Sequence, residues 1–146
     1  AKDVSAVPDW LVEATKQHTG WEQPFGEPEQ VVVARVLRGE LDIPYWQPPH
    51  LAFFVDARLN VYPNSGEIAP WWCLGNLETH SLSEIIAAFE NDAPLGLRAA
   101  YHISTQELAD RYGRRRGQRY YSPEDLRWRW THLWCGEHFP RMGPGG

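Results

Sequence analysis

The sequence predicts a mostly helical α+β fold, in which one small antiparallel β-hairpin packs against several α-helices. Helices are indicated by apolar residues at intervals of three and four, in segments bounded by N-capping residues and glycines. The hairpin is indicated by two β-rich runs, LAFFVD and LNVYP, separated by a short turn. At 146 residues the chain is expected to form a single domain with a core of its own.

Residues 1–50 are expected to form a helical flank followed by a proline-rich connector. Pro8 suits the first turn of a helix, and Gly20 is a natural end for it. A second helix is expected within EPEQVVVARVLRGE, where Gly39 ends the helix and one stripe consists of Val32, Val33, Val36 and Leu37. The segment LDIPYWQPPH is broken by prolines, so it is expected to be extended.

Residues 51–90 are expected to form the hairpin and one covering helix. Ser81 and Glu84 have the spacing of a capping box, which predicts a helix that begins after Ser81. One face of a sheet needs an apolar helical stripe to cover it. The expected buried stripe consists of Leu82, Ile85, Ile86 and Phe89, packed against Phe53, Val55 and Val61.

Residues 91–139 are expected to be helical as well. The sequence predicts a short helix behind Pro94, a capped helix ending at Gly113 and a last helix beginning at Pro123. Residues 140–146, which are rich in glycine and proline, are expected to form a disordered tail.

Composition favours a soluble binding domain in the cytoplasm. No apolar run approaches the roughly 20 residues that span a bilayer, and no basic segment followed by an apolar one predicts a signal peptide. Two cysteines far apart in sequence favour a reducing compartment. The net charge of −5 disfavours a nucleic-acid partner, whereas eight Trp, six Tyr and five Phe can line a groove or an interface.

Three separated pieces of residues 51–90 resemble one known family. They are NVYPN at 60–64, LGNL at 74–77 and SLSEI at 81–85. In order and spacing they are similar to the C-terminal accessory region of radical S-adenosylmethionine enzymes, called the SPASM or twitch domain. In that family the hairpin ends in VYPC, a loop with LGNL follows, and a helix begins with SLEEI.

The chain departs from the family at its cluster ligands. Asn64 stands where the family has a cysteine, and amides are poor ligands for iron–sulfur clusters, which are held by thiolates. Two cysteines cannot supply a four-thiolate site. The resemblance therefore implies a non-catalytic accessory domain that binds substrate, such as a peptide or protein, or docks on a radical S-adenosylmethionine core barrel. The iron–sulfur cluster and S-adenosylmethionine would belong to that core.

The loop after the hairpin is the first candidate binding surface. An exposed Trp beside Tyr62 and Asn64 would make a recognition platform, and Trp71 and Trp72 follow closely. We expect at least one of these two Trp side chains to be exposed. The alternative is that both rings fill the core volume that a cluster would occupy.

The segment HLWCGEH gives a second candidate, a structural zinc site. His132, Cys135 and His138 are three residues apart on the last helix, and thiolate and imidazole are zinc ligands. Cys73 is a candidate for the fourth ligand. The alternative is that the cysteines are simply buried and that the histidines cap a helix C-terminus.

The segment RYGRRRGQRYY gives a third candidate, a basic surface made of Arg114, Arg115, Arg116 and Arg119. Guanidinium groups pair with phosphates and tyrosine rings stack on bases, so this segment could bind nucleic acid. The alternative is a solvated loop whose arginines pair with some of the chain's 19 acidic residues.

No catalytic constellation is apparent in the sequence. It contains no phosphate-binding glycine-rich loop, no serine-nucleophile motif and no His-Glu-x-x-His. Enzymatic activity of this chain by itself is therefore left open, and binding is the expected role.

Overall fold

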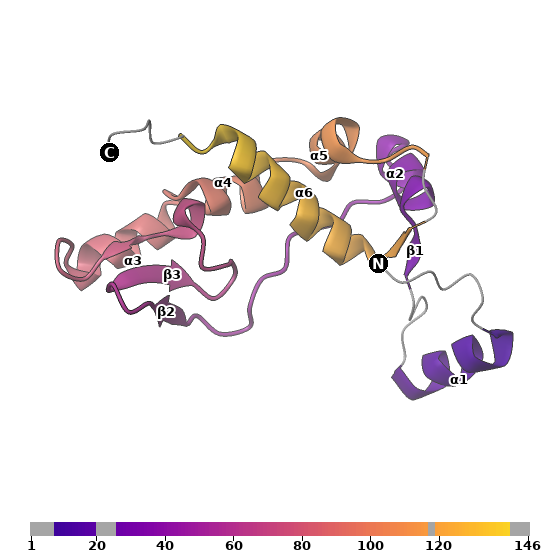
Figure 1. The fold of residues 1–146 in the computed structure, drawn as a ribbon, viewed down its shortest axis with the longest axis horizontal. Coiled ribbons are helices and arrows are strands. Elements are labelled where there is room, and N and C mark those ends of the chain that lie inside the picture. The colour runs from indigo at the N-terminus through magenta and orange to yellow at the C-terminus, as the bar shows by residue number, and fades with distance from the viewer. Residues whose placement is uncertain (1–7, 20–25, 117–118, 141–146) are drawn as a thin grey trace. The chain divides into compact units, whose positions relative to one another are not determined.

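The computed structural model describes residues 8–19, 26–116 and 119–140. Helices and two small antiparallel sheets make up these parts of the chain, which confirms the predicted mostly helical α+β class (Figure 1). The chain forms two compact units. Unit 1 comprises residues 1–44 and 104–130, and unit 2 comprises residues 45–103 and 131–146. Gly20 and residues 141–146 of the predicted tail lie outside the described residues.

Unit 1 is built on two helices that pack against each other, α2 (Glu29–Leu37) and α5 (Thr105–Tyr112). The three valines of the predicted α2 stripe are buried and Leu37 is half-buried. The inward face of α5 is buried through Leu108 and Ala109. The other elements of this unit are α1 (Asp9–Thr19), a sheet of β1 (Glu27–Pro28) with β5 (Tyr120–Tyr121), and the first part of α6 (Pro123–His138).

Unit 2 contains the predicted hairpin, its covering helix and one further strand. The hairpin strands are β2 (Phe53–Val55) and β3 (Asn60–Pro63), and β4 (Gly75–Asn76) pairs with the other edge of β3. The helices are η1 (Pro70–Trp72, a 3-10 turn), α3 (Leu82–Glu90), α4 (Leu95–His102) and the end of α6. α3 runs alongside the hairpin (Figure 1), and its N-terminus carries the predicted capping box of Ser81 and Glu84.

The hairpin turn is held by the carboxylate of Asp56. Its Oδ1 accepts hydrogen bonds from the backbone N–H groups of Arg58 and Asn60, at 2.8 and 2.9 Å. Its Oδ2 accepts from the Asn60 side chain at 3.0 Å and from the Tyr62 hydroxyl at 3.2 Å. The turn also forces Leu59 to a positive φ of 65°, a conformation that most side chains avoid.

The expected stripe of α3 is only partly buried. Ile85 is fully buried, and Phe89 packs edge-to-face on Phe53 with ring centroids 5.7 Å apart. Leu82 and Val55 were expected in the core, but they are 61% and 51% exposed. The sheet is too short to cover the whole stripe, since β2 is an edge strand of three residues and β4 has only two.

The centre of the unit 2 core is Trp72. Its side chain is only 2% exposed, and its ring lies 5.8 Å from the ring of Tyr45. The indole lies against two glycines, because a Cβ on Gly66 would be 2.2 Å from it and a Cβ on Gly96 would be 2.4 Å from it. Both positions therefore require glycine for the indole to fit.

Candidate functional site

Asn64, which replaces the family's cysteine, is used to fasten the backbone. Its Nδ2 donates to the carbonyl of His50 at 2.8 Å, and its Oδ1 accepts from the N–H of Ala52 at 3.3 Å. Its own N–H donates to the carbonyl of Ala52 at 3.0 Å. The side chain thus ties the proline-rich connector to the end of the hairpin, and its amide is engaged rather than presented to a ligand.

The aromatic candidates around the hairpin lie mostly inside. Tyr62 is 6% exposed and Trp72 is 2% exposed, so neither forms the expected platform. Trp71 is half-buried, with its ring edge-to-face against His132 at 4.9 Å and against Phe139 at 5.9 Å. Trp72 therefore follows the alternative prediction, in which the ring fills the core. Gly66 and Gly96 leave room for its indole.

The two cysteines occupy different environments. Cys73 is half-buried, and its thiol donates to the carbonyl of Gly75 at 3.4 Å. Cys135 is fully buried, and burial raises the pKa of its thiol to about 12. The two thiols therefore differ in exposure, and Cys135 is the buried one.

The two histidines of the predicted zinc site have other partners. His132 Nδ1 lies 3.1 Å from a carboxylate oxygen of Glu67. His138 Nδ1 lies 2.8 Å from the carbonyl of Trp134, and its ring stacks on that indole at 4.0 Å. Within residues 8–19, 26–116 and 119–140, no three His, Cys, Asp or Glu side chains are grouped so as to hold a metal ion.

The four predicted basic residues, Arg114, Arg115, Arg116 and Arg119, are all exposed in unit 1. Arg115 pairs with Asp110 at 2.7 Å. A shallow hollow beside this pair is lined by Glu107 and Asp110 as well as by Arg115. Because acidic side chains share the hollow with the arginine, it is poorly suited to a phosphate.

One hollow in unit 2 lies next to the hairpin turn and has a structural explanation. It has a volume of about 480 Å³ and is lined in part by Asp56, Tyr62 and Cys73. The Asp56 carboxylate already accepts four hydrogen bonds. The pKa of the Asp56 carboxyl lies below its usual value, mainly because the Asn60 side chain donates a hydrogen bond to the carboxylate. This carboxylate stabilises the turn and is not free for a ligand.

A different hollow in unit 2 has the features of a binding site, and we call it the connector groove. It has a volume of about 400 Å³ and lies between the connector, the end of α3 and α4. Its lining is partly apolar and partly acidic: Gln47, Pro48, Leu51, Ser65, Phe89, Glu90, Asp92 and Tyr101. Volumes of this size are typical of sites that hold small molecules or single side chains.

The most buried polar group of the connector groove is the hydroxyl of Ser65. This residue is 5% exposed, and its Oγ has no hydrogen bond of acceptable geometry. The neighbouring Tyr101 hydroxyl donates to the carbonyl of Trp46 at 3.4 Å. Burial raises the pKa of the Tyr101 hydroxyl, the Ser65 hydroxyl opposes this shift, and the Asp92 carboxylate adds to it. Ser65 thus offers the groove a buried donor and acceptor.

Asp92 reaches the connector groove from an unusual backbone position. It follows the C-terminus of α3 with φ of 48°. Its N–H donates to the carbonyl of Phe89, and the N–H of Ala93 donates to that of Ala88, which is the hydrogen-bond pattern of a Schellman motif. Glycine is preferred at this position. The Asp92 carboxylate lies 2.6 Å from Nε2 of His102.

The groove residues are not arranged for nucleophilic catalysis. A serine nucleophile needs a base within hydrogen-bond reach, and the base must be oriented by a third group. His102 uses Nε2 to contact Asp92, and Ser65 Oγ has no hydrogen bond to a base. Ser65 is therefore not activated as a nucleophile in this arrangement.

Comparison with known proteins adds no relative. No family model matches the chain, and neither the curated proteins nor the solved structures gave a match.

Proposed function

We propose that this chain is a non-catalytic binding domain, similar in design to the SPASM-like accessory region of radical S-adenosylmethionine proteins, that holds a peptide or protein segment in the connector groove. The observation that carries the proposal is the groove itself. It combines the buried Ser65 hydroxyl, two carboxylates and apolar walls in one hollow. Sites that recognise ligands combine apolar walls with a few convergent polar groups in this way.

The exposed apolar side chains of unit 2 support a protein partner. Besides Leu82, which lies at the start of α3 and outside the groove, five large ones in this unit are each more than half exposed: Trp46, Leu51, Phe54, Val55 and Ile68. Leu51 lines the groove, and Trp46 accepts the hydrogen bond from Tyr101, which also lines it. Exposed apolar side chains near a groove are typical of surfaces that dock on other proteins.

The role of Asn64 supports an accessory domain that works without a cluster. Where the family uses a cysteine to bind a cluster, Asn64 fastens the connector through hydrogen bonds to His50 and Ala52. The connector forms one wall of the groove through Pro48 and Leu51. In this proposal Asn64 keeps that wall in place without metal.

The test is the binding of a random array of 12-residue peptides to the full chain and to two leucine variants. Leu51→Ala removes an exposed groove residue, whereas Leu82→Ala removes an equally exposed leucine of the same unit outside the groove. Truncating a leucine that is partly buried by a ligand should weaken binding by about 1 kcal/mol, roughly fivefold.

We expect Leu51→Ala to weaken the selected peptides and Leu82→Ala to leave them unchanged. The proposal fails if the array selects no peptide. It also fails if Leu82→Ala weakens binding while Leu51→Ala does not.

A further inference from the structure

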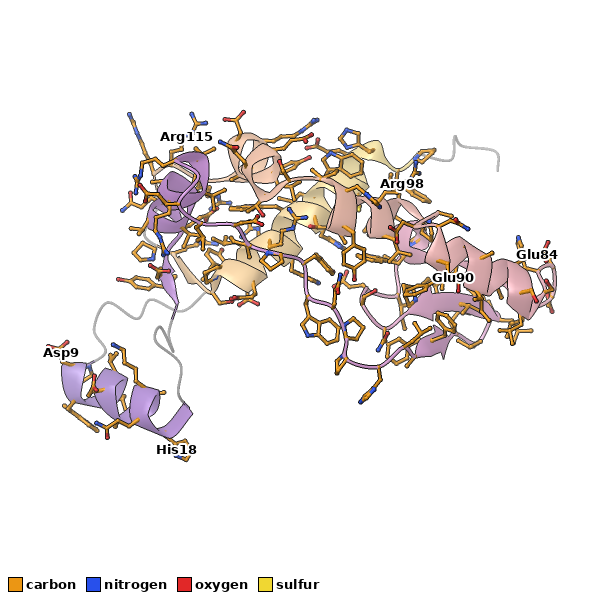
Figure 2. The ribbon with its side chains drawn as sticks, turned by 180° about the vertical axis from the view of Figure 1, so that it is seen from behind. Asp9, His18, Glu84, Glu90, Arg98 and Arg115 are labelled. Carbon is orange, nitrogen blue, oxygen red and sulfur yellow. The ribbon has the colours of Figure 1, made fainter. Side chains whose placement is uncertain are left out.

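The charges of the connector groove are of one sign. Glu90 and Asp92 are its two charged lining residues, and none of the described residues that line it is a lysine or an arginine. Glu90 lies at the C-terminal end of α3, far from Glu84 at the other end (Figure 2). The groove is therefore electronegative and favours a cation.

The walls of the groove suit a cation that carries an apolar stem. Tyr101 and Phe89 supply aromatic rings, and Pro48 and Leu51 supply aliphatic surface. Aromatic faces attract cations electrostatically, and the stems of Arg and Lys pack on apolar surface. The Ser65 hydroxyl can accept a hydrogen bond from such a donor-rich group.

The backbone at Asp92 indicates that its carboxylate has a use. A side chain at φ of 48° is less favourable than glycine in a Schellman motif. One contact of this carboxylate is with His102, whose side chain is 61% exposed, whereas the Asp92 side chain is 29% exposed. A pair with one solvated partner contributes little to stability. Asp is one of the few residues other than glycine that adopt this conformation, and here it places a carboxylate in the lining of the groove where glycine would place none.

We propose that the connector groove binds the side chain of an arginine or lysine within a basic peptide segment. The carboxylates of Glu90 and Asp92 would pair with the cationic head, and the rings and aliphatic residues would cover its stem. This inference rests on the proposed peptide-binding function and adds the chemical class of the recognised residue. Recognition of neutral or acidic segments is the competing outcome.

The first test is the composition of the peptides that the random array selects. Binders should be enriched in Arg and Lys over Asp and Glu. A set of binders without this enrichment would overturn the inference and leave the peptide-binding function intact, whereas an array with no binder would overturn both.

The second test uses the tightest selected peptide that contains an arginine, synthesised with Arg or with citrulline, its neutral isostere, at that position. Affinity for the full chain is measured by fluorescence anisotropy. The variants are Asp92→Asn, which tolerates the positive φ, and Glu90→Gln. The control is Glu78→Gln, which removes the same charge from an exposed site outside the groove.

We expect the wild type to prefer the Arg peptide about tenfold, since hydrogen bonds to a charged group differ by that order from neutral ones. Asp92→Asn and Glu90→Gln should each reduce this preference, and Glu78→Gln should preserve it. Equal binding of the citrulline peptide would overturn the inference. The inference would also be overturned if Glu78→Gln lowered the Arg preference as much as Asp92→Asn and Glu90→Gln do. The attraction would then come only from the net charge of the protein.

A stability measurement separates binding from a structural role of Asp92. Asp92→Gly should keep or raise the unfolding temperature, because glycine suits the positive φ, and it should still lower the Arg preference. A variant that loses stability and keeps its preference would show that the carboxylate only fastens α3 to α4.

Discussion

The effect of Gly96→Ala on stability should depend on whether the Trp72 indole is present, because the two residues are in contact. The indole is 2% exposed, so Trp72→Ala should destabilise the protein by about 3–5 kcal/mol. A Cβ on Gly96 would lie 2.4 Å from the rigid indole, so Gly96→Ala should also destabilise, by about 1–3 kcal/mol. In the Trp72→Ala background the added methyl group has room, and alanine favours the α4 helix over glycine by up to about 1 kcal/mol. There Gly96→Ala should be neutral or stabilising.

The assay is urea unfolding of the wild type, both single variants and the double variant. Circular dichroism at 222 nm is the appropriate signal, because tryptophan fluorescence changes with the mutation itself. The reasoning is refuted if Gly96→Ala has the same effect in both backgrounds, since neighbours in contact must couple. A matched control is Gly39→Ala at the end of α2. There a methyl group meets nothing within 4 Å, and any cost should come from its positive φ of 72° and be independent of Trp72.

Three other predictions concern the hairpin and the thiols. Leu59→Asn should stabilise the protein by about 1 kcal/mol in urea unfolding, because Asn tolerates the positive φ; Leu59→Ala should not, and equal effects would contradict the strain argument. The pKa of Asp56 is lowered in the folded state, so its contribution to stability should be present above the pKa of the unfolded chain and be lost as the pH falls through the folded value. Asp56→Asn should remove that part of the acid dependence, and an unchanged pH profile would count against the turn network. A thiol reagent should modify Cys73 in the native protein at pH 8 and leave Cys135 unmodified until unfolding, because Cys135 is buried with a pKa of about 12. Modification of both at one rate would contradict its burial.

Local signals in the sequence were sufficient to predict the fold class and several element boundaries. Ser81 accepts from the N–H of Glu84, and Ser104 accepts from that of Glu107, so both predicted helix starts are present. The β1–β5 pair was not predicted, because its two-residue strands are joined only through contacts distant in sequence. The exposure of Leu82 was missed for a related reason, since helical periodicity does not reveal how far a sheet extends.

The candidate site was much harder to predict than the fold. The connector groove is made from four separate stretches of chain, so no motif or fixed spacing marks it. The position of Trp72 depends on the close approach of Gly66 and Gly96, which lie on either side of it in sequence. The resemblance to the accessory domain predicted binding on the loop from Asn64 to Cys73, but Asn64 hydrogen-bonds to the backbone of the connector and Trp72 lies in the core. Asp92, at the position after the α3 C-terminus where glycine is common, is a local signal that could have pointed to the groove.

Binding in the connector groove can be mapped by titrating the isotope-labelled full chain with a selected basic peptide and following backbone amide chemical shifts. The largest changes should fall on residues 47–51, Ser65, residues 89–92 and Tyr101, because these residues form the groove or lie beside its lining. Changes centred on Arg114, Arg115, Arg116 and Arg119 of unit 1, or spread evenly over the chain, would contradict binding in the groove.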